Sequence, residues 1–254
     1  MKRIYKYCIA SLLLLLGLAQ AKAQSRTIYV VAAGISDYQY INDLRSSAKD
    51  AEDFAALYKT HTRHVTLLTG QQATRCAILQ AFRQIAAEAD REDIVVFFFS
   101  GHGGKGGLCT YETSGMATAL TYKDIQTELA NCKAANKQMF IDACFSGGLR
   151  TKGQRQTATA SQVFSKTEGV MLFLSSRTSE PSRERSIDSN SLFTKHLLRG
   201  LKGAADDNRD RIVAAKELFN YVSKKVKNDS KNGQNPVMWG KFRDDMHILN
   251  WNPL

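Results

Sequence analysis

Cysteine is scarce in this chain, and its scarcity excludes two classes of small stabilised fold. There are 5 cysteines in 254 residues, with no CxxC pair and no Cys/His spacing typical of zinc sites. Only Cys76, Cys109, Cys132 and Cys144 follow the first hydrophobic segment, which is too few for a disulfide-dense scaffold. If Cys144 stays a thiol, at most two of the other three can pair. The pairing we expect is Cys109 with Cys132.

Long hydrophobic runs are also missing. The most apolar segment covers residues 9–19, which is shorter than the roughly 20 apolar residues that a membrane-spanning helix needs. Basic residues precede it, and an A-x-A sequence ending at Ala23 follows it, as in a secretory signal peptide. We therefore predict that residues 1–23 are cleaved near Ala23. Residues 24–254 would then be exported to the periplasm or the extracellular space, without membrane attachment.

Runs of like charge are absent as well. The formal charge is +11, and loss of the four basic residues of the leader reduces it to +7. The remaining basic residues are scattered, with no run of five and no interleaved aromatic residues of the kind that bind single-stranded nucleic acid. We expect a solvated basic surface and no specific nucleic-acid partner. Nucleic-acid binding, if it occurred, would show a steep dependence on salt.

The chain does contain a regular alternation of short apolar runs and amphipathic segments. The apolar runs suit strands buried on both faces of a parallel sheet, and the amphipathic segments have the 3.6-residue period of helices. This order predicts one α/β domain with a mostly parallel sheet flanked by helices on both faces. The predicted strands are 28–33, 65–68, 94–99, 138–141 and 170–174; the helices are 45–58, 75–89, 122–132, 192–201 and 215–226; a short hairpin covers 108–120.

The alternation is interrupted after the fourth predicted strand. Residues 147–168 are rich in Gly, Ser, Thr, Gln and basic residues, a composition that predicts an exposed flexible loop. We see no internal repeat and no second core. The domain is therefore predicted to consist of a larger part (27–148), a basic linker (149–168) and a smaller part (169–254).

Two strand ends carry reactive side chains set among glycines. In an open α/β sheet, ligands bind beyond the carboxyl ends of the strands. The sequence SGHGG, which contains His102, follows strand 94–99, and DACFSGG, which contains Cys144, follows strand 138–141. An imidazole next to a thiol favours the thiolate and later protonates a leaving amine. Taken singly, Cys144 reads as a core thiol and His102 as a loop histidine. Together, at one sheet edge, they predict a catalytic pair.

These two motifs resemble the catalytic motifs of the caspase-like cysteine peptidases, and more closely those of metacaspases and their bacterial relatives than those of animal caspases. The resemblance covers residues 27–226. It implies a caspase-like fold, a thiolate on Cys144, a general acid/base on His102, an oxyanion hole from the backbone of Gly103 and Cys144, and no cofactor in the chemistry. Phe145 stands where metacaspases commonly have His, so the subfamily is less closely matched than the chemistry.

The same resemblance implies a preference for basic side chains at P1. Metacaspases hold Arg or Lys with acidic residues near both motifs, and the matching positions are Asp50 and Asp142, with Ser47 and Ser100 as polar neighbours. Buried unpaired carboxylates are costly, so two of them near a cleft predict a cationic partner such as a substrate guanidinium. We expect protein or peptide substrates that are cleaved after Arg or Lys.

Other interpretations of the acidic residues remain open. Asp50 would then be an ordinary exposed helix residue, and Asp142 would orient His102 or cap a turn. Glu180 and Glu184 are the reserve candidates for a basic P1 pocket.

The predicted linker also carries basic residues that such a pocket would accept. Exposed tips rich in small and polar residues are where proteolysis concentrates. In caspase-like enzymes the matching loop is often cut during maturation. We therefore expect self-cleavage after Arg150, Lys152, Arg155 or Lys166, the alternative being an inert surface loop.

A second function class and a metal site complete the predictions. The alternative to a peptidase is a non-catalytic binding or regulatory module on the same fold, against which the intact His/Cys pair argues. Asp206, Asn208, Asp210, Ile212 and Glu217 fall at positions 1, 3, 5, 7 and 12 of an EF-hand-like loop, which makes calcium the candidate cation. Position 6 is Arg rather than the usual Gly, and the alternative is a polar turn with Glu217 opening a helix. The sequence indicates no oligomeric state.

Overall fold

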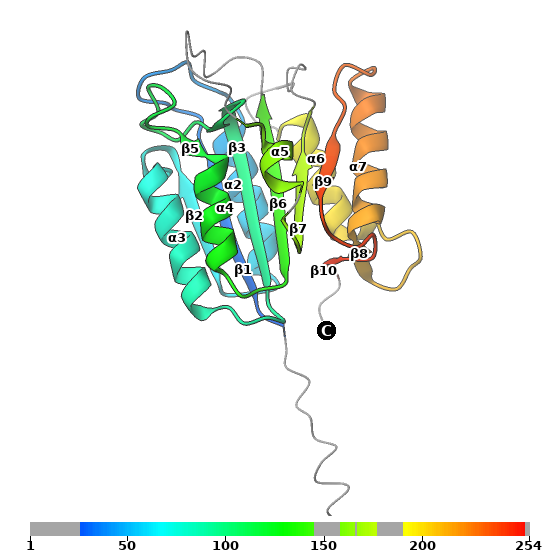
Figure 1. Ribbon diagram of the computed structural model, residues 1–254. Coiled ribbons are helices and arrows are strands. Elements are labelled where there is room, and N and C mark those ends of the chain that lie inside the picture. Colours follow the sequence, from blue (N-terminus) through cyan, green and yellow to red (C-terminus); the bar gives the residue numbers. More distant parts are fainter. Residues whose placement is uncertain (1–25, 145–157, 166, 177–189, 252–254) are drawn as a thin grey trace, which may run out of the picture.

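The computed structural model describes residues 26–144, 158–165, 167–176 and 190–251. Within them, a central β-sheet is covered by helices on both faces (Figure 1). The strands follow the order β2-β1-β3-β6-β7-β9, in which β9 is antiparallel to β7 and the others are parallel. The bounds are β1 Ile28–Gly34, β2 Val65–Thr69, β3 Ile94–Gly104, β6 Asn136–Cys144, β7 Val170–Leu174 and β9 Val237–Gly240.

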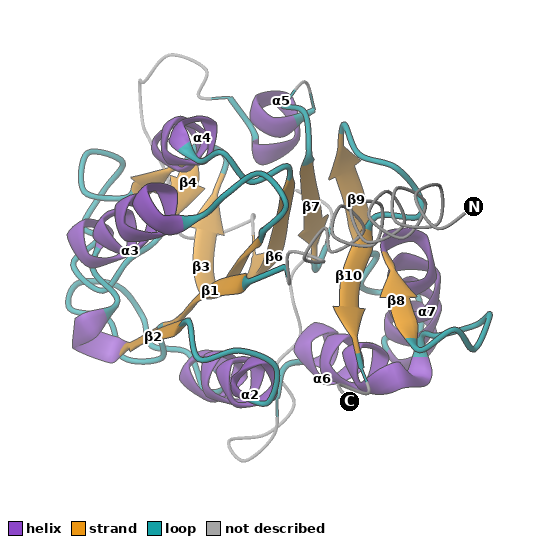
Figure 2. Ribbon diagram, turned by 90° about the horizontal axis from the view of Figure 1, so that it is seen from below, coloured by secondary structure: helices purple, strands orange, loops and turns teal. Residues whose placement is uncertain are grey.

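The helices form one layer on each face of the sheet, as Figure 2 shows from below. The predicted α/β fold is thereby confirmed, and each predicted helix and strand is present with its ends shifted by a few residues. One layer contains α2 (Ser47–Lys59), α6 (Leu192–Arg199) and α7 (Ala215–Asp229), and the other contains α3 (Arg75–Glu88), α4 (Tyr122–Asn131) and α5 (Ala160–Phe164).

Strand β3 shows how the sequence produces two cores, one on each side of the sheet. Successive side chains of a strand point to opposite faces. Val96 and Phe98 therefore pack under α2 and α6, whereas Phe97 and Phe99 pack under α3 and α4. Phe98 stacks on Phe54 of α2 with ring centroids 4.4 Å apart. Burial of each such side chain contributes about 1.5–3 kcal/mol, so the central strand is held firmly from both sides.

Two central strands are longer than their apolar runs. β3 continues through the SGHGG motif to Gly104, and β6 extends to Cys144. The reason is mutual pairing: the two motifs continue the parallel ladder, with Ser100 opposite Asp142 and His102 opposite Cys144. The motifs are therefore part of the sheet rather than of the loops after it.

The predicted exposed loop contains a short helix, α5. The prediction of loop structure across 147–168 is wrong for its Ala160–Phe164 segment, in which Val163 and Phe164 are buried. Thr159 caps this helix by accepting a hydrogen bond from the backbone N–H of Gln162 at 3.3 Å. Apolar contact with the sheet face therefore outweighs the polar composition of the flanking residues.

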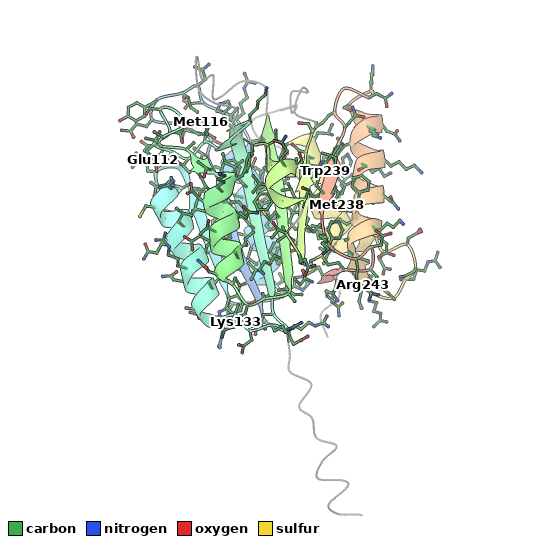
Figure 3. All side chains as sticks on the ribbon, viewed as in Figure 1. Glu112, Met116, Lys133, Met238, Trp239 and Arg243 are labelled. Carbon is green, nitrogen blue, oxygen red and sulfur yellow. The ribbon has the colours of Figure 1, made fainter. Side chains whose placement is uncertain are left out.

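The C-terminal strands were not predicted, because each is only a few residues long. β8 (Ile212–Ala214) pairs with β10 (His247–Asn250) in a two-stranded sheet, and β9 forms an edge of the main sheet among the described residues. On β9, Met238 packs against the core beneath α7, whereas its neighbour Trp239 is 46% exposed (Figure 3). The predicted hairpin is present as β4 (Gly107–Leu108) and β5 (Leu120–Thr121), which pair with each other.

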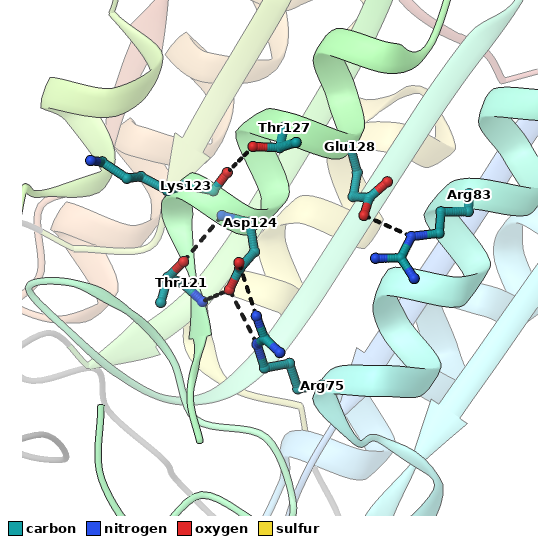
Figure 4. Close-up of polar contacts among 7 residues, drawn as sticks. All are labelled: Arg75, Arg83, Thr121, Lys123, Asp124, Thr127 and Glu128. Carbon is teal, nitrogen blue, oxygen red and sulfur yellow. Dashed lines mark hydrogen bonds and ion pairs between the residues drawn. The ribbon is translucent and has the colours of Figure 1, made fainter. Parts of the chain in front are cut away.

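Charged side chains between α3 and α4 are used in structural contacts. Arg75 Nη2 lies 3.0 Å from Asp124 Oδ1, and Arg83 Nε donates to Glu128 Oε1 at 2.9 Å (Figure 4). Asp124 also accepts from the backbone N–H of Thr121 at 3.0 Å, which completes a capping box at the beginning of α4. These contacts fix the helix layer behind the strand ends that carry the candidate site.

Candidate active site

The candidate site lies at the carboxyl ends of β3 and β6, the upper edge of the sheet in Figure 1. His102 and Cys144 are register partners in the parallel ladder. Adjacent strands are about 4.8 Å apart, so the backbones of the two predicted catalytic residues are direct neighbours. The side chain of Cys144 and residues 145–157 lie outside the described part of the chain.

The loop between β1 and α2 holds His102 on two sides. Tyr38 Oη accepts a hydrogen bond from the His102 backbone N–H at 2.7 Å, and the two rings are 5.0 Å apart between centroids. The imidazole Nε2 lies 2.8 Å from the backbone carbonyl oxygen of Asn42. Because a carbonyl only accepts hydrogen bonds, we assign the proton of the neutral ring to Nε2. Nδ1 then keeps its lone pair and can act as a base.

The sequence did not indicate Tyr38 and Asn42 as site residues. Asn42 contributes a backbone carbonyl, which every residue has, so no side-chain pattern could have identified it. Tyr38 carries a weak signal in being an aromatic residue shortly after a strand. Its hydroxyl also explains Gly101, because a Cβ there would lie 2.5 Å from Tyr38 Oη. Glycine is required at that position for close packing, not for a special backbone angle.

The predicted oxyanion hole rests on the backbone N–H groups of Gly103 and Cys144. Gly103 follows His102 in β3 and packs closely against Ala143 of β6. A Cβ on Gly103 would lie 3.1 Å from the Cβ of Ala143. The two backbones therefore approach closely next to the catalytic pair. The oxyanion role itself stays a prediction.

The four residues expected to bind a basic side chain are all buried near this sheet edge. Asp50, on α2, accepts from Ser100 Oγ at 2.9 Å, and Ser47 lies one turn earlier on the same helix. Asp142, on β6, is opposite Ser100 in the ladder. Helix α2 and strands β3 and β6 therefore bring these polar groups to one place, and their role in binding a basic side chain stays a prediction.

A serine that the sequence did not indicate joins the two carboxylates. The backbone N–H of Ser191 donates to Asp50 Oδ1 at 3.0 Å, and its hydroxyl donates to Asp142 Oδ2. Thr194 Oγ1 also donates to Asp142 Oδ2, at 3.0 Å. Ser191 is the N-cap of α6, so the beginning of this helix forms the wall between the two acids. A serine directly before a helix is a readable N-cap signal, but the contacts of Ser191 with the two acids cannot be read from the sequence.

Neither carboxylate has a cationic partner within the described residues. Burial, together with the charge of Asp142, raises the pKa of Asp50 well above its ordinary value. Burial likewise raises the pKa of Asp142, and hydrogen bonds from Ser191, Ser175 and Thr194 oppose that rise. Each acid disfavours ionisation of the other. Entry of a cation would therefore stabilise this site.

These contacts contradict an exposed Asp50 and an Asp142 that orients His102, whereas a capping role of Asp142 stays open. Asp50 is 0% exposed, so it is not an ordinary solvent-facing helix residue. Asp142 accepts hydrogen bonds from Ser191 and Thr194, and the His102 ring is oriented by a carbonyl instead. The reserve candidates Glu180 and Glu184 and the predicted cleavage sites Arg150, Lys152, Arg155 and Lys166 lie outside the described residues.

The expected disulfide is not formed: Cys76, Cys109 and Cys132 are free thiols. Cys109 follows β4, near the beginning of α4, whereas Cys132 is the C-cap of that helix. The 10 residues of α4 separate them by about 15 Å, and a disulfide needs Cα atoms within about 7 Å. Burial raises the pKa of Cys109 to about 12, which makes it an inert core thiol.

The calcium prediction gains no support from the geometry. The backbone N–H of Arg211 donates to Asp206 Oδ2 at 3.0 Å, and that of Ile212 donates to Asp210 Oδ1 at 2.8 Å. Asn208 and Glu217 likewise accept backbone N–H groups, and Glu217 caps the beginning of α7. Across the described chain, no group of three His, Cys, Asp or Glu residues is placed to hold a metal. The geometry matches the alternative, a polar turn that opens a helix, and calcium binding stays a prediction.

Comparison with known families gives the context of this site. A family model described as the caspase domain matches residues 29–247, which is most of the sequence. The chain belongs to the caspase domain family. This is a family of cysteine peptidases, so proteins or peptides are its substrate class. The paired motifs at residues 100–104 and 142–148 fall inside the matched region.

A solved structure supports the caspase fold independently. Protein GSU0716 from Geobacter sulfurreducens is 18% identical, and the alignment covers 90% of this chain and 99% of that one, with a TM-score of 0.66. At this level of identity the likeness shows the fold alone. The curated proteins contain no match. Within the described residues, no helix of this caspase domain combines the length and hydropathy needed to cross a bilayer.

Proposed function

We propose that this caspase domain is an exported cysteine endopeptidase that cleaves after Arg or Lys, with Cys144 as nucleophile and His102 as acid/base. The observation that carries the proposal is the pairing of His102 with Cys144 next to two buried acids that have no cation among the described residues. Membership of the family supports peptide hydrolysis as the reaction, and the two buried acids support a basic P1 side chain.

The proposed reaction uses the imidazole twice. His102 Nδ1 accepts the thiol proton, and the Cys144 thiolate attacks the scissile carbonyl carbon. The negative charge that develops on the carbonyl oxygen faces the backbone N–H groups of Gly103 and Cys144. His102 then protonates the leaving amine, and water hydrolyses the thioester to release the acid. The Asn42 carbonyl stabilises the protonated ring because it keeps accepting from Nε2.

Recognition of the P1 residue would require a change in the hydrogen bonds around the acids. In the structure, neutral hydroxyl and backbone groups of Ser100, Ser191 and Thr194 donate to the carboxylates. A guanidinium offers five donors in a planar fork, and charge-assisted hydrogen bonds are roughly twice as strong as neutral ones. An entering arginine therefore supplies a positive charge that the present donors lack, and it favours ionisation of the two buried acids.

Labelling of the thiol tests the proposed nucleophile against the non-catalytic alternative. Residues 24–254 should react rapidly with a peptide electrophile ending in Arg, at a rate that depends on pH because the thiolate is the reactive form. Peptide mapping by mass spectrometry should find the label on Cys144. Slow labelling spread over Cys76 and Cys144, with no pH dependence near neutrality, would favour a binding module.

Self-processing is the expected consequence of a basic P1 preference combined with a basic linker. Purified wild-type protein incubated alone should yield fragments that end at Arg150, Lys152, Arg155 or Lys166 and stay associated, because β6 and β7 belong to one sheet. Intact-mass measurement gives the cleavage sites. Cys144→Ala protein is the control, and the same fragments in both samples would assign the cuts to a contaminating protease.

A further inference from the structure

A second concave surface lies between α2 and α6, on the outer side of these helices, apart from His102. The cavity has a volume of about 570 Å³, within the range of small-molecule sites. Its floor is apolar, formed by Ala56, Leu57 and Leu198, and Thr60 and Asn190 provide polar groups at its rim. Its lining therefore combines apolar and polar groups, as small-molecule sites do.

Three cations from one side of α6 and the turn after it line this cavity: Lys195, Arg199 and Lys202. Their i, i+4, i+7 spacing places them along one stripe that is about 10 Å long. None of them forms an ion pair within the described residues. The cavity's one acid, Asp53, is paired with Lys49 at 2.8 Å and also interacts electrostatically with Lys202, so one carboxylate is shared among several cations and a net positive charge remains.

Stabilisation of the helix dipole does not account for this arrangement. Cations near a helix C-terminus are favourable, which could explain Arg199 and Lys202. Lys195, however, lies in the first half of α6, four residues after the N-cap Ser191, where the dipole disfavours a cation. A multivalent anion in the cavity would compensate all three charges together.

We propose that the cavity between α2 and α6 binds a small anion that carries two or more phosphate groups. The stripe of cations is too long for a single phosphate and matches a chain of them. Asn190 lies at one end of the cavity, where its side-chain amide donates to Asp53 at 2.9 Å. The proposal concerns a site apart from the peptidase centre and does not depend on catalysis.

Isothermal titration calorimetry with tripolyphosphate tests this site on residues 24–254 carrying Cys144→Ala, which removes catalysis from the experiment. We expect saturable binding with one site per chain, weakened by added salt. The triple variant Lys195→Gln, Arg199→Gln, Lys202→Gln should bind at least about tenfold more weakly, because three charge-assisted contacts are lost. Equal melting temperatures would show that the variant is folded.

A matched control removes the same charge elsewhere. Lys123, Lys224 and Lys227 lie away from the cavity and form no ion pair in the described structure, and their replacement by Gln should change the affinity by no more than about twofold. Equal weakening by both triple variants would show attraction to the overall basic surface and overturn the proposal. Absence of saturable binding to the starting protein at low salt would overturn it as well.

Discussion

Cys144→Ala and His102→Ala should each lower the rate of peptide cleavage by at least about a thousandfold, because the two residues act as one unit. For the same reason the double variant should be no slower than either single variant. The measurement is kcat/KM on an Arg-containing fluorogenic peptide with purified residues 24–254.

The control for this prediction is the thiol that the structure leaves exposed. Cys76→Ser changes an exposed cysteine in the first turn of α3, outside the paired β3 and β6 motifs, and should retain full activity. Circular dichroism and the melting temperature should be unchanged in all the variants. A folded Cys144→Ala protein that still cleaves the peptide would exclude Cys144 as the nucleophile.

Asp50→Asn and Asp142→Asn should each lower kcat/KM for Arg substrates by about ten- to a hundredfold, while leaving cleavage of substrates with a neutral P1 residue nearly unchanged. The acids have no cationic partner among the described residues, so the loss falls on the interaction with the substrate cation. The substitution preserves shape: an asparagine at position 50 can accept from the Ser191 N–H and donate to Ser100 Oγ.

The same variants should not be destabilised at neutral pH. Because burial raises the pKa of both carboxyls, the folded protein binds protons more strongly than the unfolded chain, whose Asp pKa is near 3.8. Stability contributed by these protonated groups is therefore lost as the pH rises from the unfolded pKa through the folded one. An asparagine carries no charge and avoids that loss, so Tm at neutral pH should be equal or higher.

Other outcomes of the specificity experiment would assign the pocket elsewhere. Unchanged rates in both Asn variants, with wild-type cleavage still after Arg, would move the acidic role to Glu180 or Glu184. A fall in Tm together with a loss of activity on every substrate would instead make Asp50 and Asp142 structural residues. Control assays with Asp at P1 should show no cleavage.

Much of the fold was predictable because hydrophobic periodicity directly reflects burial. The run IVVFFF is short, continuous and apolar, which is typical of a strand with apolar neighbours on both faces, and it lies at the centre of the sheet. Segment 160–164 was misassigned, because its polar surroundings concealed two buried side chains, Val163 and Phe164. The edge strand β9 was missed because four residues give no reliable alternation.

At the candidate site, side chains were predictable but backbone partners were not. His102 was found from its type and its place after a predicted strand, whereas Asp50 and Asp142 were predicted from the resemblance to metacaspases. The Asn42 carbonyl that orients His102 and the Ser191 N–H that binds Asp50 belong to the main chain, which is the same in every residue. Only tertiary structure brings such groups into place. The Cys109–Cys132 pairing failed for a related reason, since sequence separation does not indicate distance across a helix.

The peptidase assignment is tested most directly by a cleavage assay on three matched peptides with Arg, Lys or Asp at P1, analysed by product mass. Wild-type residues 24–254 should cut the Arg and Lys peptides on the carboxyl side of the basic residue and leave the Asp peptide intact, and the Cys144→Ala protein should cut none of them. Preferential cleavage after Asp would contradict the acidic pocket. The peptidase assignment itself would be contradicted if folded wild-type protein, given time to self-process, cleaved none of the three peptides.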